Sequence, residues 1–161
     1  MECFWDNLYR QVGPDLLAFF ARRHGQPHLA EDLLQNTFVQ AMRREDRVRE
    51  AVSPRAYLFG IARHLSQEEF RRPELETEAM EEMAAEPSPA VDPRLEAMNQ
   101  AIQELPEAHR EALELRLRHE LSYEEIAVVL KIPVGTVRSR LHLAVRRLRE
   151  VIVKSPAAIH L

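Results

Sequence analysis

The sequence predicts an all-α protein built from two small helical domains joined by a flexible acidic linker. The chain has 161 residues, of which 45 % are hydrophobic, and this is enough to form a packed core. Leucine, alanine, glutamate and arginine dominate while glycine occurs only 4 times, a composition that favours helix. Residues 73–93 interrupt the helical pattern, because they hold several prolines and acidic side chains but no basic ones. We therefore expect domains at residues 1–72 and 94–155.

The first domain begins with an apolar pattern that we interpret as two short helices. Gly13 and Pro14 lie between the two apolar groups, and both residue types interrupt helices. Another helix follows over residues 30–44, where an apolar and a polar face recur at helical spacing. The apolar face contains Ala30, Leu33, Leu34, Phe38, Ala41 and Met42, and the polar face contains Asp32, Gln35, Asn36 and Arg43.

A further helix is predicted after a charged loop at residues 44–52. Ser53 is placed to cap this helix, and Pro54 to occupy its first position. Basic and aromatic side chains alternate along it: Arg55, Tyr57, Phe59, Arg63 and His64. This mixture suits single-stranded nucleic acid, because bases stack on aromatic rings and phosphates pair with cations. An ordinary amphipathic helix with aromatic core residues is the alternative that the composition leaves open.

The linker has two interpretations. Its acidic side chains can simply keep an exposed segment soluble. They can also form a polyanion that shields a basic domain from non-specific DNA.

The second domain begins with two helices that are parted near Pro106. Their apolar positions include Ile102, Leu105, Ala112, Leu113, Leu115 and Leu117. A short helix then starts at the capping box Ser122–Glu125, followed by a turn at residues 131–134 and a second helix from about residue 135. Two short helices with a tight turn between them are typical of a helix-turn-helix.

The last helix has an apolar and a basic face, and residues 122–154 are basic although the chain has net charge −4. Val137, Leu141, Ala144, Val145 and Leu148 are expected to pack inward, and Arg138, Ser139, His142 and Arg146 to point outward. The backbone N–H groups around Thr136 would suit a phosphate. Arg138 can reach a guanine in the major groove, and Arg146 a phosphate. A solvated basic helix face is the alternative for these arginines.

Other classes of function find little support in the residues. There is no glycine-rich phosphate loop and no H-E-x-x-H motif, so we expect neither an enzyme nor a cofactor. His24 and His28 have a spacing that metal ligands use, but without an obvious third ligand we predict no metal site. Cys3 is the single cysteine, and no segment near the start is apolar enough to span a bilayer. We expect a cytoplasmic protein without membrane insertion.

The order of these motifs resembles the sigma-70 family of RNA polymerase initiation factors, in its extracytoplasmic-function (ECF) group. The small members of this group keep only regions 2 and 4. The resemblance to region 2 rests on "AEDLLQNTFVQAMRR" and "SPRAYLFGIARHL". The resemblance to region 4 rests on "AIQELPEAHREALELR" and "LSYEEIAVVLKIPVGTVRSRLHLAVRRL". It covers almost the whole chain.

The resemblance implies a role for each set of residues. Asp32, Gln35, Asn36 and Phe38 fall on the helix that binds core RNA polymerase. The loop at residues 44–52 falls where a flipped −10 base is held, and Arg55, Tyr57, Arg63 and His64 fall on the helix that contacts the −10 element. Arg138, Ser139 and His142 fall on the exposed face of the helix that reads the −35 element.

The resemblance also implies partners: core RNA polymerase, promoter DNA and an anti-sigma factor. A free-standing helix-turn-helix transcription regulator is the alternative, although the region 2 motifs argue against it. The chain departs from the family at several positions. Glu120 and Lys131 stand where glycine is common, and Tyr57 stands where tryptophan is usual.

Overall fold

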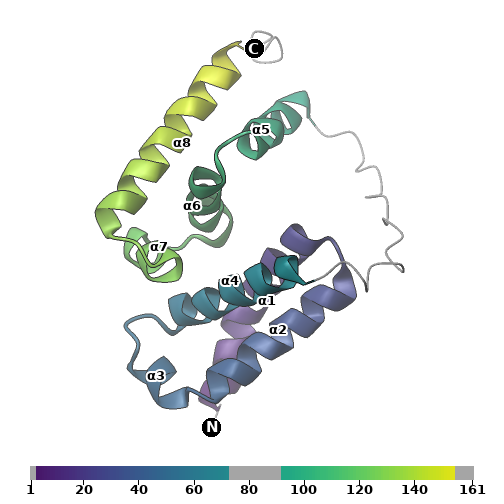
Figure 1. Ribbon diagram of the computed structural model, residues 1–161, viewed down its shortest axis with the longest axis vertical. Helices are drawn as coiled ribbons and strands as arrows, with labels where there is room; N and C mark the ends of the chain where they lie inside the picture. Colours follow the sequence, from purple (N-terminus) through teal and green to yellow (C-terminus); the bar gives the residue numbers. More distant parts are fainter. Residues whose placement is uncertain (1–2, 73–91, 155–161) are drawn as a thin grey trace. The chain divides into compact units, whose positions relative to one another are not determined.

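A computed structural model describes residues 3–72 and 92–154 of the chain, and all the regular elements in these ranges are α-helices (Figure 1). The helices are α1 (Phe4–His24), α2 (Pro27–Met42), α3 (Glu45–Glu50), α4 (Pro54–Arg71), α5 (Pro93–Gln103), α6 (Glu107–His119), α7 (Tyr123–Leu130) and α8 (Val134–Lys154). The prediction of an all-α fold is confirmed.

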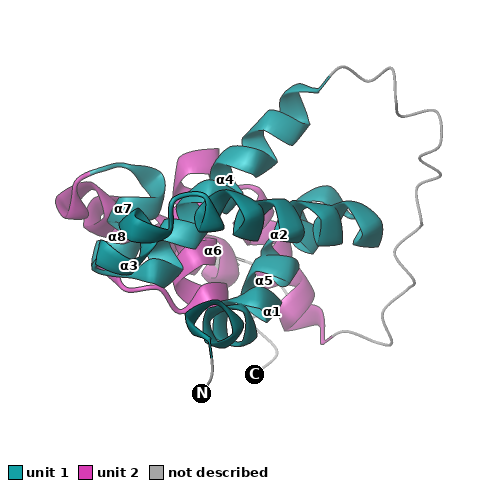
Figure 2. Ribbon diagram, turned by 90° about the horizontal axis from the view of Figure 1, so that it is seen from below, with its two compact units in different colours: residues 1–72, 124–132 teal, residues 73–123, 133–161 magenta. Residues whose placement is uncertain are grey.

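The chain divides into two compact units (Figure 2). The first comprises residues 1–72 and 124–132, and the second comprises residues 73–123 and 133–161. The predicted domain limits at 72 and 94 stay predictions. Most of the predicted linker, residues 73–91, lies outside the described residues. Its last two residues open α5, because Asp92 caps this helix by accepting a hydrogen bond from the Arg94 N–H at 3.0 Å.

α1 is one continuous helix, so the prediction of two short helices was wrong. Pro14 lies inside it and has no N–H to donate to the helical hydrogen bonds. The apolar stripe nevertheless continues past the proline, since Leu8, Val12 and Leu16 are all buried. Burial of this stripe on both sides of Pro14 offsets the local cost of about 3 kcal/mol that an interior proline imposes.

The core of the first unit lies between α1, α2 and α4, which pack against one another (Figure 1). Phe20 and Phe59 are completely buried in it. The Phe19 ring lies edge-on to both, with centroids 5.4 and 5.8 Å away. Edge-to-face aromatic contacts add about 0.5–1.5 kcal/mol to the burial of the rings. This three-helix core is the support on which the exposed faces of α2 and α4 are presented.

The predicted loop at residues 44–52 contains the six-residue helix α3. Its charges follow the helix dipole, with Glu45 and Asp46 in the first turn and Arg47 and Arg49 in the last turn. Val48 anchors it, since its side chain is fully buried. The sequence analysis missed this helix because a single apolar residue gives no periodic pattern.

α4 begins where predicted. The Ser53 hydroxyl accepts a hydrogen bond from the Ala56 N–H at 3.0 Å, and Pro54 is the first helical residue. Such a cap is worth about 1 kcal/mol. The predicted core positions Leu58, Ala62 and Leu65 are buried, whereas Ile61 is half-buried.

In the second unit, α8 packs against α5 and α6. The predicted break near Pro106 is confirmed, and Leu105 beside it is buried. Two positions assigned to the core are instead exposed, Leu117 at 56 % and Val145 at 37 %. In both helices the buried face is narrower than the apolar stripe.

Glu120 and Lys131 have left-handed backbone conformations, with φ of 54° and 57°. Glu120 ends α6, and the Leu121 N–H after it bonds back to the Leu115 carbonyl. Lys131 follows α7, and the next N–H bonds back to the Ala127 carbonyl. These are the two positions where the resemblance to sigma-70 proteins implies glycine. A side chain at such an angle costs about 1–2 kcal/mol.

We therefore expect Glu120→Gly and Lys131→Gly to stabilise the protein, each by about 1 kcal/mol, since relief of the left-handed strain exceeds the entropy lost by glycine. Gly25→Ala is the opposite control, because Gly25 has φ of 67° and its substitution should destabilise. Chemical denaturation of the three variants measures the changes. Loss of stability in both glycine variants would contradict this account.

Candidate functional site

The polar face of α2 is exposed. Asp32, Gln35 and Asn36 all lie on the surface, one helical turn or less apart. The Gln40 side chain donates a hydrogen bond of 3.4 Å to the side-chain amide oxygen of Asn36. Phe38 is different: its side chain is 4 % exposed, and its ring packs at 4.9 Å from that of Tyr9. The three polar residues can therefore contact a partner directly, whereas Phe38 supports the helix from inside.

The α2 surface also contains apolar side chains that the sequence analysis missed. Val39 is 46 % exposed and follows Gln35 and Asn36 at helical spacing. Met42, which was assigned to the core, is 49 % exposed at the last position of α2. The spacing of apolar residues identifies the buried face of a helix. It does not show how far the neighbouring helices cover that face. A surface that combines polar and apolar side chains suits a protein partner.

On α4, Tyr57 is half-buried and His64 is exposed. Helical spacing places both on one face, with Gly60 and Ile61 between them. His64 lies 3.0 Å from the Glu68 carboxylate and forms an ion pair when it is protonated. Gly60 has open space where a Cβ would be. This face therefore presents an aromatic ring and an imidazole, with open space at Gly60 between them.

Arg55 lies on another side of α4. Its guanidinium group is 2.9 Å from the Asp15 carboxylate of α1 and 5.9 Å from the Phe59 ring centroid. Both partners belong to the first unit, so Arg55 connects α4 to α1. Arg63 is half-buried. The four predicted −10 residues thus do not share one face, and Tyr57 and His64 are the pair that the structure brings together.

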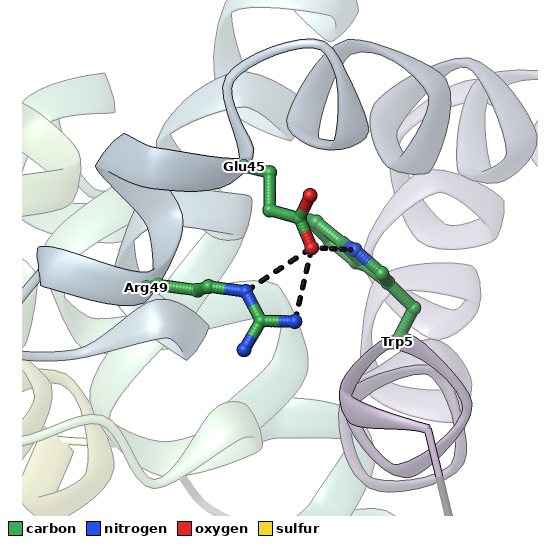
Figure 3. Close-up of polar contacts among 3 residues, drawn as sticks. All are labelled: Trp5, Glu45 and Arg49. Atoms are coloured by element: carbon green, nitrogen blue, oxygen red, sulfur yellow. Dashed lines mark hydrogen bonds and ion pairs between the residues drawn. The ribbon is translucent and has the colours of Figure 1, made fainter.

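The first turn of α1 and the helix α3 are joined by polar contacts around Glu45, which Figure 3 shows. The Trp5 indole N–H donates to the Glu45 carboxylate at 3.0 Å, and Arg49 donates two hydrogen bonds to the same oxygen at 3.1 and 3.0 Å. These hydrogen bonds, from Arg49 first and Trp5 second, lower the pKa of Glu45 below its ordinary value. The contribution of this carboxylate to folding is therefore present above pH 4.5 and is lost as pH falls through its lowered pKa.

His24 was considered as a metal ligand, and its ring nitrogen lies 2.9 Å from the Ser66 hydroxyl. The Phe70 ring stacks on it at 4.4 Å. Burial, and then the positive charge of Arg23, lower the pKa of His24, so the folded chain favours the neutral ring. Over residues 3–72 and 92–154, no three potential ligand side chains gather to hold a metal ion. In the same ranges, no helix is long and apolar enough to cross a membrane.

The outer face of α8 contains the predicted basic and polar residues. Arg138, Ser139, His142 and Arg146 are exposed and fall within one side of the helix by their spacing. Arg146 lies 3.8 Å from the Glu150 carboxylate, one turn further along. This face is long enough to follow the floor of a DNA groove, since each residue adds about 1.5 Å.

Thr136 lies in the first turn of α8. Its backbone N–H and that of Val137 both donate to the Pro133 carbonyl, at 3.0 and 3.2 Å. The turn before α8 therefore uses the Thr136 N–H itself. That backbone N–H groups around Thr136 contact a phosphate stays a prediction. The Thr136 side chain, which is half-buried, stays a candidate for contact with DNA.

Comparison with known proteins identifies the family. The model for Sigma-70 region 2 matches residues 8–74, and the model for Sigma-70, region 4 matches residues 95–148. The ECF RNA polymerase sigma factor EcfG of Rhodopseudomonas palustris is 30 % identical over 136 residues, which cover 81 % of this chain and 75 % of EcfG. The chain belongs to the ECF group of the sigma-70 family. The α2, α3 and α4 surfaces thus lie in region 2, and the α8 surface lies in region 4.

One further relative and one solved structure are similar to the chain over most of its length. The ECF sigma factor SigE of Mycolicibacterium smegmatis is 34 % identical over 160 residues, which cover 93 % of this chain but only 62 % of SigE. The sigma factor RpoE of Bartonella quintana, solved in complex with the anti-sigma factor NepR, is 26 % identical with a TM-score of 0.70. That match covers 94 % of this ECF chain and 98 % of RpoE.

Proposed function

We propose that this ECF chain is a transcription initiation factor that binds core RNA polymerase and directs it to specific promoters. In this proposal, region 2 captures the melted −10 element and region 4 reads the −35 element. One observation supports it above the others: region 2 and region 4 occur in order on one chain, at residues 8–74 and 95–148. A free-standing DNA-binding regulator has no need of region 2.

The surfaces described above can be matched to these tasks. The exposed α2 face of Asp32, Gln35 and Asn36, extended by Val39 and Met42, suits a protein partner, and we assign it to core polymerase. Tyr57 and His64 on α4 suit unstacked bases, since an aromatic ring can stack on any base. The basic face of α8 suits the major groove of a duplex.

The proposal also covers regulation and location. The similar RpoE was solved with an anti-sigma factor, and we infer that a protein of this kind holds the present chain inactive. Core polymerase works in the cytoplasm, so the chain acts there. Polymerase itself forms the RNA bonds, and the chain has no catalytic role in this proposal.

Transcription reconstituted with core polymerase across a promoter library tests the proposal. We expect promoter-specific initiation only when the chain is present. If the chain leaves polymerase unchanged yet binds one duplex site alone, it is a free-standing regulator and the proposal is rejected.

The α2 assignment is tested by Gln35→Arg. A long cation in the middle of this face should weaken binding to core polymerase about tenfold or more, which corresponds to about 1.4 kcal/mol. Gln11→Arg is the matched control, because Gln11 is an equally exposed glutamine on α1. Titration of labelled variants with core polymerase gives both affinities. Equal weakening by the two changes would show that charge, rather than this face, is responsible.

A further inference from the structure

The interactions within α3 are too few to hold this helix in place. It is six residues long, too short to be stable as an isolated helix. Arg44 precedes it without a side-chain cap, and Val48 is its one buried residue. The position of α3 must therefore depend on contacts with other elements.

The contacts around Glu45 supply such a tether (Figure 3). Trp5, in the first turn of α1, is separated from Glu45 by 40 positions in the sequence, so its hydrogen bond joins distant parts of the first unit. Arg49 completes the arrangement, because it bonds the same carboxylate oxygen and its guanidinium lies 4.3 Å above the Phe4 ring. Phe4 and Trp5 are in turn packed edge to face at 5.2 Å.

The segment that α3 leads into has an exposed side chain that a ligand could contact. The Val52 side chain is fully exposed at the end of the connection to α4. It is followed directly by the Ser53 cap, which fixes the start of the helix with Tyr57 and His64. The tether at Glu45 and the cap at Ser53 thus fix the two ends of one exposed segment.

We propose that Trp5 and Glu45 are positioning residues that hold residues 44–52 ready to receive the unstacked promoter strand. This inference rests on the proposed function, because it assigns the segment to the −10 element. Holding the segment in advance lowers the conformational entropy that binding must remove, and this raises affinity without any new contact to DNA. Neither residue needs to touch the DNA.

The test uses full-length chain bound to core polymerase and a labelled promoter fragment with a premelted −10 segment, taken from a promoter that the wild type selects. Trp5→Phe keeps an aromatic ring but removes the N–H donor. We expect it to weaken binding to this fragment about fivefold, with unchanged affinity for core polymerase. Tyr9→Phe is the control, since it removes one polar group from a different aromatic residue of α1, which is exposed.

A second variant shows whether Trp5 acts through Glu45. We expect Glu45→Ala to weaken binding as much as Trp5→Phe or more, and the double variant to be no weaker than Glu45→Ala alone. The proposal would be overturned if the double variant lost affinity by the product of the two single losses. It would also be overturned if Trp5→Phe bound the fragment as tightly as the wild type. A parallel loss of core polymerase affinity would also overturn it, because that result indicates general damage to region 2.

The outcomes distinguish failure of the proposed function from failure of the positioning role alone. If the wild-type chain gives no promoter-specific initiation, the proposed function fails. If it initiates normally and Trp5→Phe binds the premelted fragment equally well, only the positioning role fails.

Discussion

Phe59→Ala is expected to destabilise region 2 by about 3–5 kcal/mol. The Phe59 side chain is completely buried between the helices of the first unit, and its ring meets the edge of Phe19. Its removal leaves a cavity and also deprives the Arg55 guanidinium of the ring beside it. Since small domains are stable by only about 5–15 kcal/mol, this loss should be visible as a large drop in the thermal midpoint.

Thermal unfolding followed by circular dichroism measures the change. Val52→Ala is the control, because Val52 is fully exposed and its truncation should leave the midpoint nearly unchanged. A midpoint for Phe59→Ala close to that of the wild type would mean that the ring does not have the buried position described here.

Arg138→Ala is expected to abolish discrimination at one base pair of the −35 element, with a loss of about 1–3 kcal/mol. Arg138 is exposed near the start of α8, on the face shared with Ser139 and His142. Its guanidinium can form two hydrogen bonds with a guanine edge, which no other base offers in the same arrangement. The loss should therefore be confined to promoters that carry the preferred base.

Arg147→Ala is the matched control, since it removes the same charge from the opposite side of the same helix. Transcription from a library randomised in the −35 element compares the two variants. A uniform loss from Arg138→Ala across all sequences would indicate a phosphate contact instead of base recognition.

Much of the fold could be predicted because helix ends have local signals. Ser53 and Pro54 open α4 as their chemistry predicts, and Pro106 separates α5 from α6. Pro14 shows the limit of such signals. The same residue type precedes the start of one helix, at Pro106, and lies inside another, at Pro14. Around Pro14, apolar side chains are buried on both of its flanks.

The sequence was enough to predict which faces of the helices are exposed, but not which distant residues contact one another. The spacing of Asp32, Gln35 and Asn36 is enough to place them on one polar side of α2. No local pattern indicates that Arg55 pairs with Asp15 or that Trp5 bonds Glu45, because each pair is separated by 40 positions. These contacts result from tertiary packing, which also decides that Phe38 lies inside.

The indole of Trp5 gives the first unit its own fluorescence signal. The chain has 1 tryptophan, and it lies in the contact between α1 and α3. Its intrinsic fluorescence therefore reports on this one place, whereas far-ultraviolet circular dichroism averages over every helix. Two unfolding curves recorded with these signals coincide if the whole chain melts in one step. Their separation measures directly how independently the parts of this sigma factor unfold, without any attached label.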